Sequence, residues 1–296
     1  CLVNPRACNE TELNYLPTDA KKKVAVVGAG AAGMQASIVL DQRGHDVTLF
    51  EAGDKIGGQL NMAAVIPGKE EFHGMLAYFG RMIELSDVDV RLNTRATASD
   101  LEGFDEVIVA TGVTPRDPQI EGQDHPKVLS YIDVLAGGAD VGEKVAVIGA
   151  GGIGFDVSEY LVQEHPSPTV NLDEWLEEWG VADPEKHDGG LSPQGPQPSA
   201  PARQVTLLQR KTSKHGAGLG KTTGWIHRSS LRMKDVNFIG GVNYERVGDE
   251  GLMISDGEAR ENPRWLDVDN IILCAGQESL RDLAEPLEAK GVTVHV

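Results

Sequence analysis

Short runs of apolar residues recur along the chain, separated by glycine clusters and by stretches in which apolar and polar residues mix. Near the start, an apolar run at 24–27 and a strand-like segment at 46–51 flank a helix-like stretch at 34–43, which Gly44 ends. Strands that are buried on both faces of a parallel sheet show runs of this kind. The order strand, helix, strand within about 30 residues therefore predicts a β-α-β unit.

The same pattern returns later in the chain. A second unit opens with the run at 144–148, and its helix is expected at about 153–163. Two blocks of alternating strands and helices predict an α/β protein with two Rossmann-like, doubly wound dinucleotide-binding domains, the second inserted in the first. We expect the first domain at 21–115 and 277–296, and the second at 116–276. Further strands are predicted at 88–92, 106–110, 205–208 and 270–274.

Two segments lack this pattern. Residues 1–20 show no clear period and contain Pro5 and Pro17, so we expect them to form a connecting arm. Residues 165–203 are rich in Pro, Gly and Ser, and within them only the piece at 172–179 is amphipathic. An irregular insertion in the second domain is therefore predicted over 165–203.

A glycine-rich motif follows the first strand and opens the first helix. In a GxGxxG motif the first glycine permits a tight turn, the second lets the backbone approach a pyrophosphate, and the third lets the helix pack close to the strand. The pyrophosphate then lies at the helix N-terminus, where free N–H groups and the helix dipole favour an anion. The alternative is that the glycines serve only the tight turn. The motif consists of Gly28, Ala29, Gly30, Ala31, Ala32 and Gly33.

Residues beyond the motif indicate which dinucleotide it binds. Glu51 ends the second strand, 18 residues past Gly33, where a carboxylate can bind ribose hydroxyls. The doublet Gly57-Gly58 follows, and its backbone can lie against a diphosphate that a larger side chain would block. The segment 106–112 is similar to the strand and Ala-Thr-Gly sequence of flavoproteins with two dinucleotides. Together these features favour FAD.

A second GxGxxG motif lies 121 residues after the first (Gly28 to Gly149), and it too follows a strand and opens a helix. Its spacing predicts a second dinucleotide site by the same reasoning. The motif consists of Gly149, Ala150, Gly151, Gly152, Ile153 and Gly154.

Two assignments compete for the residue that selects the second dinucleotide. A conventional spacing points to Asp173, 24 residues past Gly149, whose carboxylate would bind the ribose of NADH. The better strand, at 205–208, leads to Arg210 and Lys211, which would pair with the 2′-phosphate of NADPH. We prefer NADPH, because Asp173 heads the amphipathic piece and is typical of a helix cap. The alternative for Arg210 and Lys211 is that they are ordinary solvated charges.

The composition limits the partners. The net charge is −18, from 45 acidic and 27 basic residues. Nucleic acids and anionic membranes require a basic surface, so we expect general binding to neither. An anionic ligand must then be held by helix N-termini, backbone amides or a few placed cations. No apolar run approaches the ~20 residues that a membrane-spanning helix needs, and no signal peptide is visible.

The three cysteines, Cys1, Cys8 and Cys274, do not form a disulfide framework and favour a reducing compartment, the cytoplasm. A disulfide reductase that uses a pyridine nucleotide would need a paired redox motif near the first domain, and the sequence has none. The eight histidines show no metal-ligand spacing. Because cofactors carry out hydride transfer themselves, we assign no catalytic acid or base.

Further motifs carry a family resemblance. The chain is similar over essentially its whole length, including the insertion, to bacterial NADPH-dependent 2,4-dienoyl-CoA reductases, within the old-yellow-enzyme-like iron–sulfur flavoproteins. Besides the two fingerprints, the motifs are the segment 1–8, Arg116 with the run 124–131, and the segments 189–195 and 218–227.

The resemblance implies that the chain is the C-terminal half of a longer enzyme, truncated at both ends. Such enzymes have an N-terminal barrel with FMN and the substrate site, a 4Fe-4S cluster, and an FAD/NADPH half. Hydride enters at FAD, single electrons cross the cluster to FMN, and FMN reduces the dienoyl-CoA. Cys1 corresponds to the last of four cluster cysteines. In the family a Gly-Gly-x-Asp segment that completes the FAD site follows residue 296, so this polypeptide alone is not expected to reduce dienoyl-CoA.

The resemblance also implies nucleotide contacts. Trp225 is implied near the nicotinamide–flavin contact, with a tryptophan packed in the core as an equal alternative. Related enoate or amine dehydrogenases, and a non-catalytic electron-relay module that binds FAD, stay open as other functions. FAD contacts are implied at Gly28 to Gly33, Glu51, Gly58, Gln59, Lys69 and the strand end near Thr97, and NADPH contacts at Gly151, Gly152, Arg210 and Lys211.

Overall fold

The computed structural model describes residues 3–164 and 166–296, which form two compact units. Unit 1 comprises the residues up to Ala64, Glu71–Thr114 and Glu278–Val296, and unit 2 comprises Val65–Glu70 and Pro115–Gln277. The sequence grouped residues 65–70 with the first unit, whereas the structure groups them with the second. There the Lys69 ammonium lies 2.6 Å from the Asp156 carboxylate, and the Gly68 N–H donates to the Thr169 hydroxyl (3.1 Å).

Unit 1 is built on a five-stranded parallel sheet with the order β15-β4-β1-β2-β3. Four of the five residues of β1 and of β2 are buried, because packed elements cover both faces of the sheet. The strands predicted near 24–27, 46–51, 88–92 and 106–110 are confirmed. Their bounds are β1 Lys23–Val27, β2 Asp46–Phe50, β3 Asp89–Arg91, β4 Glu106–Val109 and β15 Thr293–His295.

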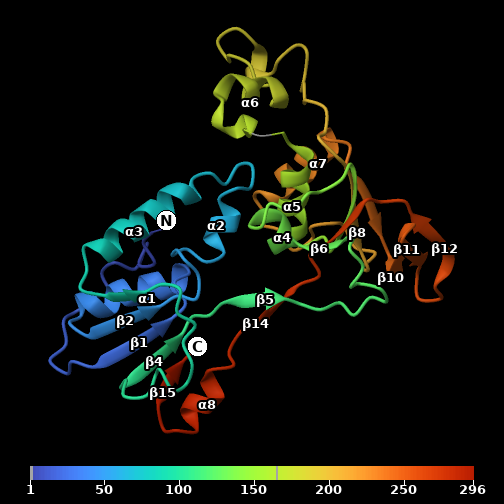
Figure 1. Cartoon of the computed structure of the whole chain (residues 1–296). Helices are drawn as coiled ribbons and strands as arrows, with labels where there is room; N and C mark the ends of the chain where they lie inside the picture. The colour runs from blue at the N-terminus through green and yellow to red at the C-terminus, as the bar shows by residue number, and fades with distance from the viewer. Residues whose placement is uncertain (1–2, 165) are drawn as a thin grey trace. The chain divides into compact units, whose positions relative to one another are not determined.

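Alternate residues of β1 feed two hydrophobic clusters, one on each face of the sheet. Val26 packs in a cluster with Met34 and Phe79, which lie on α1 and α3. Ala25 packs in the opposite cluster with Leu287 of α8. Figure 1 shows α1 between α3 and the sheet. The helices of unit 1 are α1 Ala31–Gln42, α2 Leu60–Ala63, α3 Phe72–Glu84 and α8 Ala284–Glu288.

Unit 2 repeats the plan with a parallel sheet of order β6-β13-β7-β8-β9. The strands predicted at 144–148, 205–208 and 270–274 are confirmed, as is the helix that follows the second glycine motif. The strands are β6 Val128–Ser130, β7 Lys144–Ile148, β8 Gln204–Gln209, β9 Asn237–Gly240 and β13 Asn270–Leu273, and the helices are α4 Tyr131–Leu135, α5 Gly152–Val162 and α7 Gly224–Met233.

A three-stranded antiparallel sheet, which the sequence did not predict, covers part of unit 2. It consists of β10 Val242–Gly248, β11 Gly251–Asp256 and β12 Glu261–Leu266, in the order β10-β11-β12. Its residues Val242 and Ile254 share a hydrophobic cluster with Ile148 and Leu208 at the ends of β7 and β8. Strands β5 (Val113–Pro115) and β14 (Gln277–Ser279) pair where the chain passes between the units.

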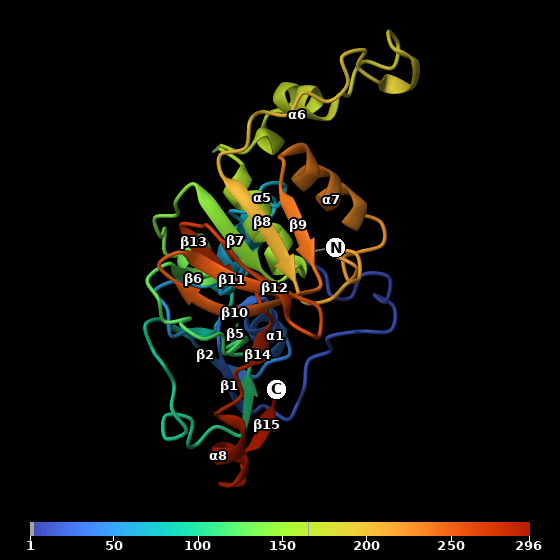
Figure 2. The same cartoon turned by 90° about the vertical axis from the view of Figure 1, so that its right-hand side faces the viewer.

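The predicted insertion stands away from the parallel sheet of unit 2 in both views (Figures 1 and 2). It contains the short 3₁₀ segments Pro168–Val170 and Asp188–Gly190, and between them α6 (Leu172–Trp179). The Asn171 side chain accepts hydrogen bonds from the first amides of α6, and Gly180 ends the helix in the left-handed conformation (φ 66°). The described part of the N-terminal arm, residues 3–20, contains neither helix nor strand.

Candidate dinucleotide-binding sites

Two glycines of the first motif are required by packing. Gly28 has φ +104°, and a Cβ there would lie 2.4 Å from the Ala110 carbonyl oxygen. A Cβ on Gly33 would lie 1.8 Å from the Gly28 carbonyl oxygen. These contacts are the tight turn and the close helix–strand approach expected of the first and third glycines.

Gly30 differs, because a Cβ there would meet nothing within 4 Å. Its backbone (φ −73°, ψ −176°) suits any residue, and no side chain caps the N-terminus of α1. A purely structural turn does not need a glycine at this position. The open space beside uncapped helical N–H groups fits a pyrophosphate.

The Gly57-Gly58 doublet lies directly against this loop. The Gly57 N–H donates to the Ala29 carbonyl oxygen (2.7 Å), and a Cβ on Gly58 would lie 3.2 Å from the Gly30 Cα. Both doublet residues have positive φ, which favours glycine. The next residue, Gln59, precedes α2, and its amide donates to the Val113 carbonyl oxygen (3.3 Å).

The Glu51 carboxylate lies at the glycine loop. It accepts hydrogen bonds from the Ala29 N–H (2.8 Å) and the Gly53 N–H (2.7 Å). Glu51 directly follows β2, at the carboxyl edge of the sheet where ligands of doubly wound folds bind. This carboxylate is therefore placed for ribose hydroxyls next to a pyrophosphate site.

Two residues implied as FAD contacts lie differently from expectation. Lys69 belongs to unit 2 and is held by both carboxylate oxygens of Asp156 (2.6 Å each). Thr97 is not at a strand end, because β3 ends at Arg91. Its N–H and hydroxyl both donate to Asp100 (2.8 and 2.7 Å), which closes a local turn.

The second glycine loop repeats the geometry of the first. A Cβ on Gly149 would lie 2.2 Å from the Cys274 carbonyl oxygen, and one on Gly154 would lie 1.7 Å from the Gly149 carbonyl oxygen. At Gly151 and Gly152 a Cβ would meet nothing within 4 Å, and α5 also begins without a side-chain cap. This loop too combines required turn glycines with open positions that fit a pyrophosphate.

Matching hydrogen bonds align the two units residue by residue. The Gly28 N–H donates to the Phe50 carbonyl oxygen (2.7 Å), and the Gly149 N–H donates to the Leu208 carbonyl oxygen (2.9 Å). The residue after Phe50 is Glu51, so its counterpart in unit 2 is Gln209. The Gln209 side chain turns to its own loop and donates to the carbonyl oxygens of Lys211 (2.9 Å) and Ser213. The sequence reasoning missed Gln209, because the match depends on the strand register.

The Asp173 alternative is wrong. Residues 169–172 form no strand, and Asp173 lies in the first turn of α6, where its N–H donates to Asn171. The strand that pairs with β7 is β8, as preferred, and Arg210 and Lys211 follow it. Both are exposed, and neither forms an ion pair within the described residues. Residues 210–234 contain no Asp or Glu, but they carry Arg210, Lys211, Lys214, Lys221, Arg228, Arg232 and Lys234.

The loop between β8 and α7 packs on the second glycine loop. The Gly216 N–H donates to the Ala150 carbonyl oxygen (3.2 Å), and Arg228 of α7 donates to the Gly216 carbonyl oxygen (3.2 Å). Trp225, in the first turn of α7, is 58% exposed, so the alternative of a tryptophan packed in the core is wrong. Its role near the nicotinamide stays a prediction.

A cluster of charged groups joins α5, α7 and the segment 65–70 in unit 2. The Glu159 carboxylate, 5% exposed, lies 2.9 Å from the His227 Nδ1, one turn along α5 from the Lys69–Asp156 pair. Burial raises the pKa of Glu159 despite this partner. The hydrogen bond to Glu159 raises the pKa of His227 against the opposing effect of burial.

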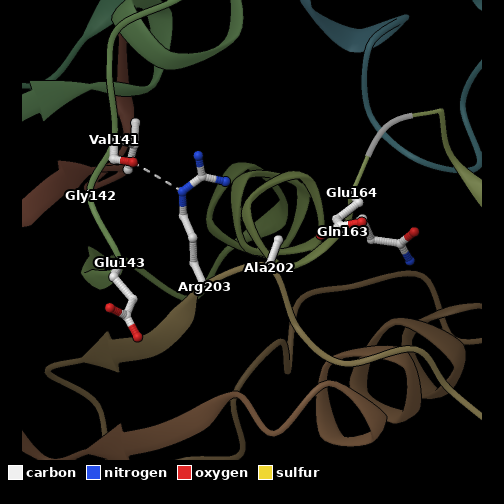
Figure 3. Close-up of a pocket in the computed structure, with 7 residues that line it drawn as sticks. All are labelled: Val141, Gly142, Glu143, Gln163, Glu164, Ala202 and Arg203. Atoms are coloured by element: carbon white, nitrogen blue, oxygen red, sulfur yellow. Dashed lines mark hydrogen bonds between the residues drawn. The ribbon is translucent and has the colours of Figure 1, made fainter.

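Unit 2 also has a surface pocket of about 560 Å³. Figure 3 shows the residues that line it. The Arg203 Nε donates to the Val141 carbonyl oxygen (3.2 Å) at its rim. The pocket lies where β7 and β8 begin, whereas the glycine loop follows the other end of β7, so it is separate from the nucleotide site. Its lining residues are Val141, Gly142, Glu143, Gln163, Glu164, Ala202 and Arg203.

Within 3–164 and 166–296, no three His, Cys, Asp or Glu side chains gather as a metal site. Cys1, predicted as a cluster ligand, lies outside the described residues. Cys8 is an exposed free thiol and Cys274 a buried one, and burial raises the pKa of Cys274. In the same part of the chain no helix is long and apolar enough to cross a membrane.

In each of the two parallel sheets a glycine loop with open space joins the central strand, β1 or β7, to the helix that follows it. This arrangement defines an α/β protein with Rossmann-like dinucleotide-binding units. Residues 22–295 match the family described as pyridine nucleotide-disulphide oxidoreductase, and the chain belongs to this family. The family implies FAD and a pyridine nucleotide as cofactors, and the fold is also that of thioredoxin reductase from T. acidophilum (TM-score 0.57, 16% identity).

Three similar proteins that are named as reductases are much longer than this chain. A metal reductase of Desulforamulus reducens is 30% identical over 98% of the chain, which covers 42% of that protein. A cinnamate reductase of Clostridium sporogenes is 37% identical over 57% of the chain and 26% of its own length. The structure of a 2-naphthoyl-CoA reductase in complex with 2-naphthoyl-CoA matches all of the chain, at TM-score 0.80 and 27% identity, and the chain covers 39% of it.

Proposed function

We propose that this chain takes hydride from NADPH and passes it to FAD, with FAD in unit 1 and NADPH in unit 2. The observation that carries the proposal is the aligned pair Glu51 and Gln209. One unit has a carboxylate after its second strand, and the other has a neutral amide followed by two exposed cations. A carboxylate suits an unmodified ribose, whereas cations without a nearby carboxylate suit a 2′-phosphate.

The residues of unit 1 fit FAD. The amides of the loop from Gly28 to Gly33, the open space at Gly30 and the backbone of Gly58 would hold the diphosphate, and Glu51 would bind ribose hydroxyls. When bound, FAD supplies the acceptor for hydride, and the chain binds and orients the two cofactors. Gln59, Lys69 and Thr97 stay proposed contacts. For Thr97, whose N–H and hydroxyl both donate to Asp100, the contact would be through the carbonyl oxygen, which has a second lone pair besides the one that accepts from the Asp100 N–H.

The residues of unit 2 fit NADPH. The open positions at Gly151 and Gly152 would take the pyrophosphate at the N-terminus of α5. Arg210 and Lys211 would hold the 2′-phosphate, with Arg able to offer two parallel donors. Trp225 is proposed near the nicotinamide.

We further propose that the longer protein is a 2,4-dienoyl-CoA reductase of fatty acid β-oxidation in the cytoplasm. It would pass electrons through a 4Fe-4S cluster, with Cys1 as one ligand, to FMN in an N-terminal barrel. The lengths of the relatives support a further domain, since the chain covers 42% of the metal reductase and 39% of the naphthoyl-CoA reductase. Cinnamate and 2-naphthoyl-CoA are both conjugated carboxylic acid derivatives, as is a dienoyl-CoA.

An amine dehydrogenase is a second candidate for the longer protein. A dimethylglycine/sarcosine dehydrogenase of Chromohalobacter salexigens is 35% identical over 53% of the chain. A disulfide-reducing activity would need a closely spaced pair of redox cysteines near the first domain, and the sequence has no such pair. A relay module that binds FAD without accepting hydride is the non-catalytic alternative.

An anaerobic titration tests the proposal. The FAD-loaded protein is titrated with NADPH and, separately, with NADH while the flavin absorbance is followed. Bleaching at much lower NADPH than NADH is expected, and Arg210→Ala should remove the preference. Bleaching by NADH alone would contradict the NADPH assignment. Firm FAD binding without bleaching by either nucleotide would contradict hydride transfer and favour the relay module that binds FAD without accepting hydride.

A further inference from the structure

The hydroxyl of Tyr244, on β10, is buried and has no hydrogen-bond partner among the described residues. Its ring packs against the hydrophobic cluster that contains Ile148 and Leu208, at the carboxyl ends of β7 and β8. Buried polar atoms are nearly always paired, because an unmade hydrogen bond costs free energy. A buried hydroxyl left unpaired calls for a partner that the described residues do not provide.

The start of β10 lies beside the loop that follows β8, because the Gly241 N–H donates to the Lys211 carbonyl oxygen (3.1 Å). The positive charge of Arg210 favours the ionised form of the Tyr244 phenol. Burial outweighs this effect and raises the pKa of Tyr244 well above its ordinary value of 10.0. The hydroxyl therefore keeps its proton at every physiological pH and can act as a donor. Arg210 itself forms no ion pair in the described part of the chain. A donor on β10 and a cation after β8, neither with a partner among the described residues, thus belong to neighbouring segments of unit 2.

We propose that the Tyr244 hydroxyl donates a hydrogen bond to the 2′-phosphate of NADPH, beside Arg210. This inference rests on the proposed function of unit 2 and adds a binding residue from the antiparallel sheet. A phosphate oxygen accepts from a phenol and a guanidinium at once, so one anion satisfies both groups. The Gln209 side chain, turned to its own loop, adds no carboxylate to repel that anion.

Substitution of Tyr244 by Phe removes the hydroxyl and keeps the ring. An unpaired buried hydroxyl costs stability, so the melting temperature of the FAD-loaded protein without nicotinamide nucleotide should stay the same or rise. Binding of NADP⁺ and of 2′,5′-ADP should weaken by about 10- to 100-fold, the worth of one hydrogen bond to a charged group. Binding of NAD⁺ and of 5′-AMP should not change. Calorimetry with these four probes measures the effect.

Tyr131 provides a matched control in unit 2. Tyr131 is 2% exposed, and its hydroxyl accepts a hydrogen bond from the Gln277 amide (2.9 Å). Tyr131→Phe should lower the melting temperature, because it leaves the amide without this acceptor, and should leave the preference for 2′,5′-ADP over 5′-AMP intact.

The outcomes separate this inference from the function it rests on. If the unmodified protein binds 2′,5′-ADP no better than 5′-AMP, the NADPH assignment and the Tyr244 contact both fail. If the preference exists and Tyr244→Phe preserves it, only the Tyr244 contact fails. If Tyr244→Phe weakens the binding of NADP⁺ and NAD⁺ equally, the hydroxyl contacts a part that both nucleotides share, and the proposed phosphate contact fails. If the variant has a much lower melting temperature, the hydroxyl has a structural role instead.

Discussion

The ammonium of Lys234 lies 2.9 Å from the carboxylate of Glu178, and both side chains are almost fully buried. Lys234 follows α7, whereas Glu178 lies on α6 within the insertion. The ammonium also donates to the carbonyl oxygen (3.1 Å) and the hydroxyl (2.6 Å) of Ser199, on the arm that returns from the insertion. One cation with all three donors engaged therefore ties both arms of the insertion to α7.

Lys234→Met should destabilise unit 2 by about 3–5 kcal/mol, because it leaves the Glu178 carboxylate buried without its cation. The insertion should become sensitive to limited proteolysis between 165 and 203. The double variant Lys234→Met with Glu178→Leu should recover much of the loss, since an apolar pair of similar volume can replace a buried ion pair. Equal protease resistance of the single variant and the parent would contradict the anchoring role.

The two kinds of glycine in the first motif should respond differently to a methyl group. Gly33→Ala places a Cβ 1.8 Å from the Gly28 carbonyl oxygen, so α1 must shift and the folded yield should fall. Gly30→Ala meets nothing within 4 Å and keeps an allowed backbone, so its folding should be normal. Its FAD occupancy, read from flavin absorbance per chain, should nevertheless drop about tenfold or more, because the methyl group fills the space for the pyrophosphate.

The second motif offers the matched test. Gly151→Ala also meets open space, and it should weaken NADPH while leaving the bound FAD unchanged. Loss of FAD in Gly151→Ala, or full FAD in Gly30→Ala, would contradict the assignment of one nucleotide to each unit.

The sequence predicted the parallel sheets well, because strands buried on both faces are continuous apolar runs such as Val145 to Ile148. It did not predict the antiparallel sheet. The sequence of β12 (Glu261–Leu266) is mostly polar and includes a proline, and four of its six residues are exposed. An edge strand with one covered face leaves little hydrophobic signal in a single sequence.

The candidate site was predictable where local motifs determine it. Both glycine loops and Glu51 follow from spacing, and the choice of Arg210 over Asp173 follows from helix capping. Lys69 could not be placed, because its partner Asp156 lies 87 residues away in the sequence. The Gln209 equivalence likewise appears only once the register of β7 with β8 is known.

The stability of unit 2 should fall as pH rises through neutrality, because of the Glu159–His227 pair. The pKa of His227 is raised above 6.5, so its contribution is full below that value and is lost as pH rises through the raised pKa. The pKa of Glu159 is raised above 4.5 by burial, so ionising it costs stability in the same direction. The charge of neighbouring Asp156 raises the pKa of both groups, and the charge of Lys69 lowers the pKa of both.

Melting temperatures from pH ~6 to ~9 test this expectation, in the range where a perturbed histidine titrates. Glu159→Gln should flatten the profile, because the amide places no buried charge beside His227. Asp249→Asn is the control. Asp249 also pairs with a histidine, His125, but the Asp249 side chain is fully exposed to solvent, so this variant should leave the slope of melting temperature against pH unchanged. A Glu159→Gln profile as steep as that of the parent would assign the slope to other groups.

Gln209→Glu should weaken the preference for NADPH over NADH by about 10- to 100-fold. The new carboxylate occupies the position that Glu51 has in unit 1, where it would repel a 2′-phosphate and accept from ribose hydroxyls. It also cannot donate to the carbonyl oxygens of Lys211 and Ser213, so the loop that presents the cations loses its tie. The ratio of kcat/KM for flavin reduction by the two nucleotides measures the change. Gln204→Glu is the matched control, because it adds the same charge at the far end of β8, and it should leave the ratio unchanged. If both variants shift the ratio equally, the effect comes from net charge and not from the position after β8.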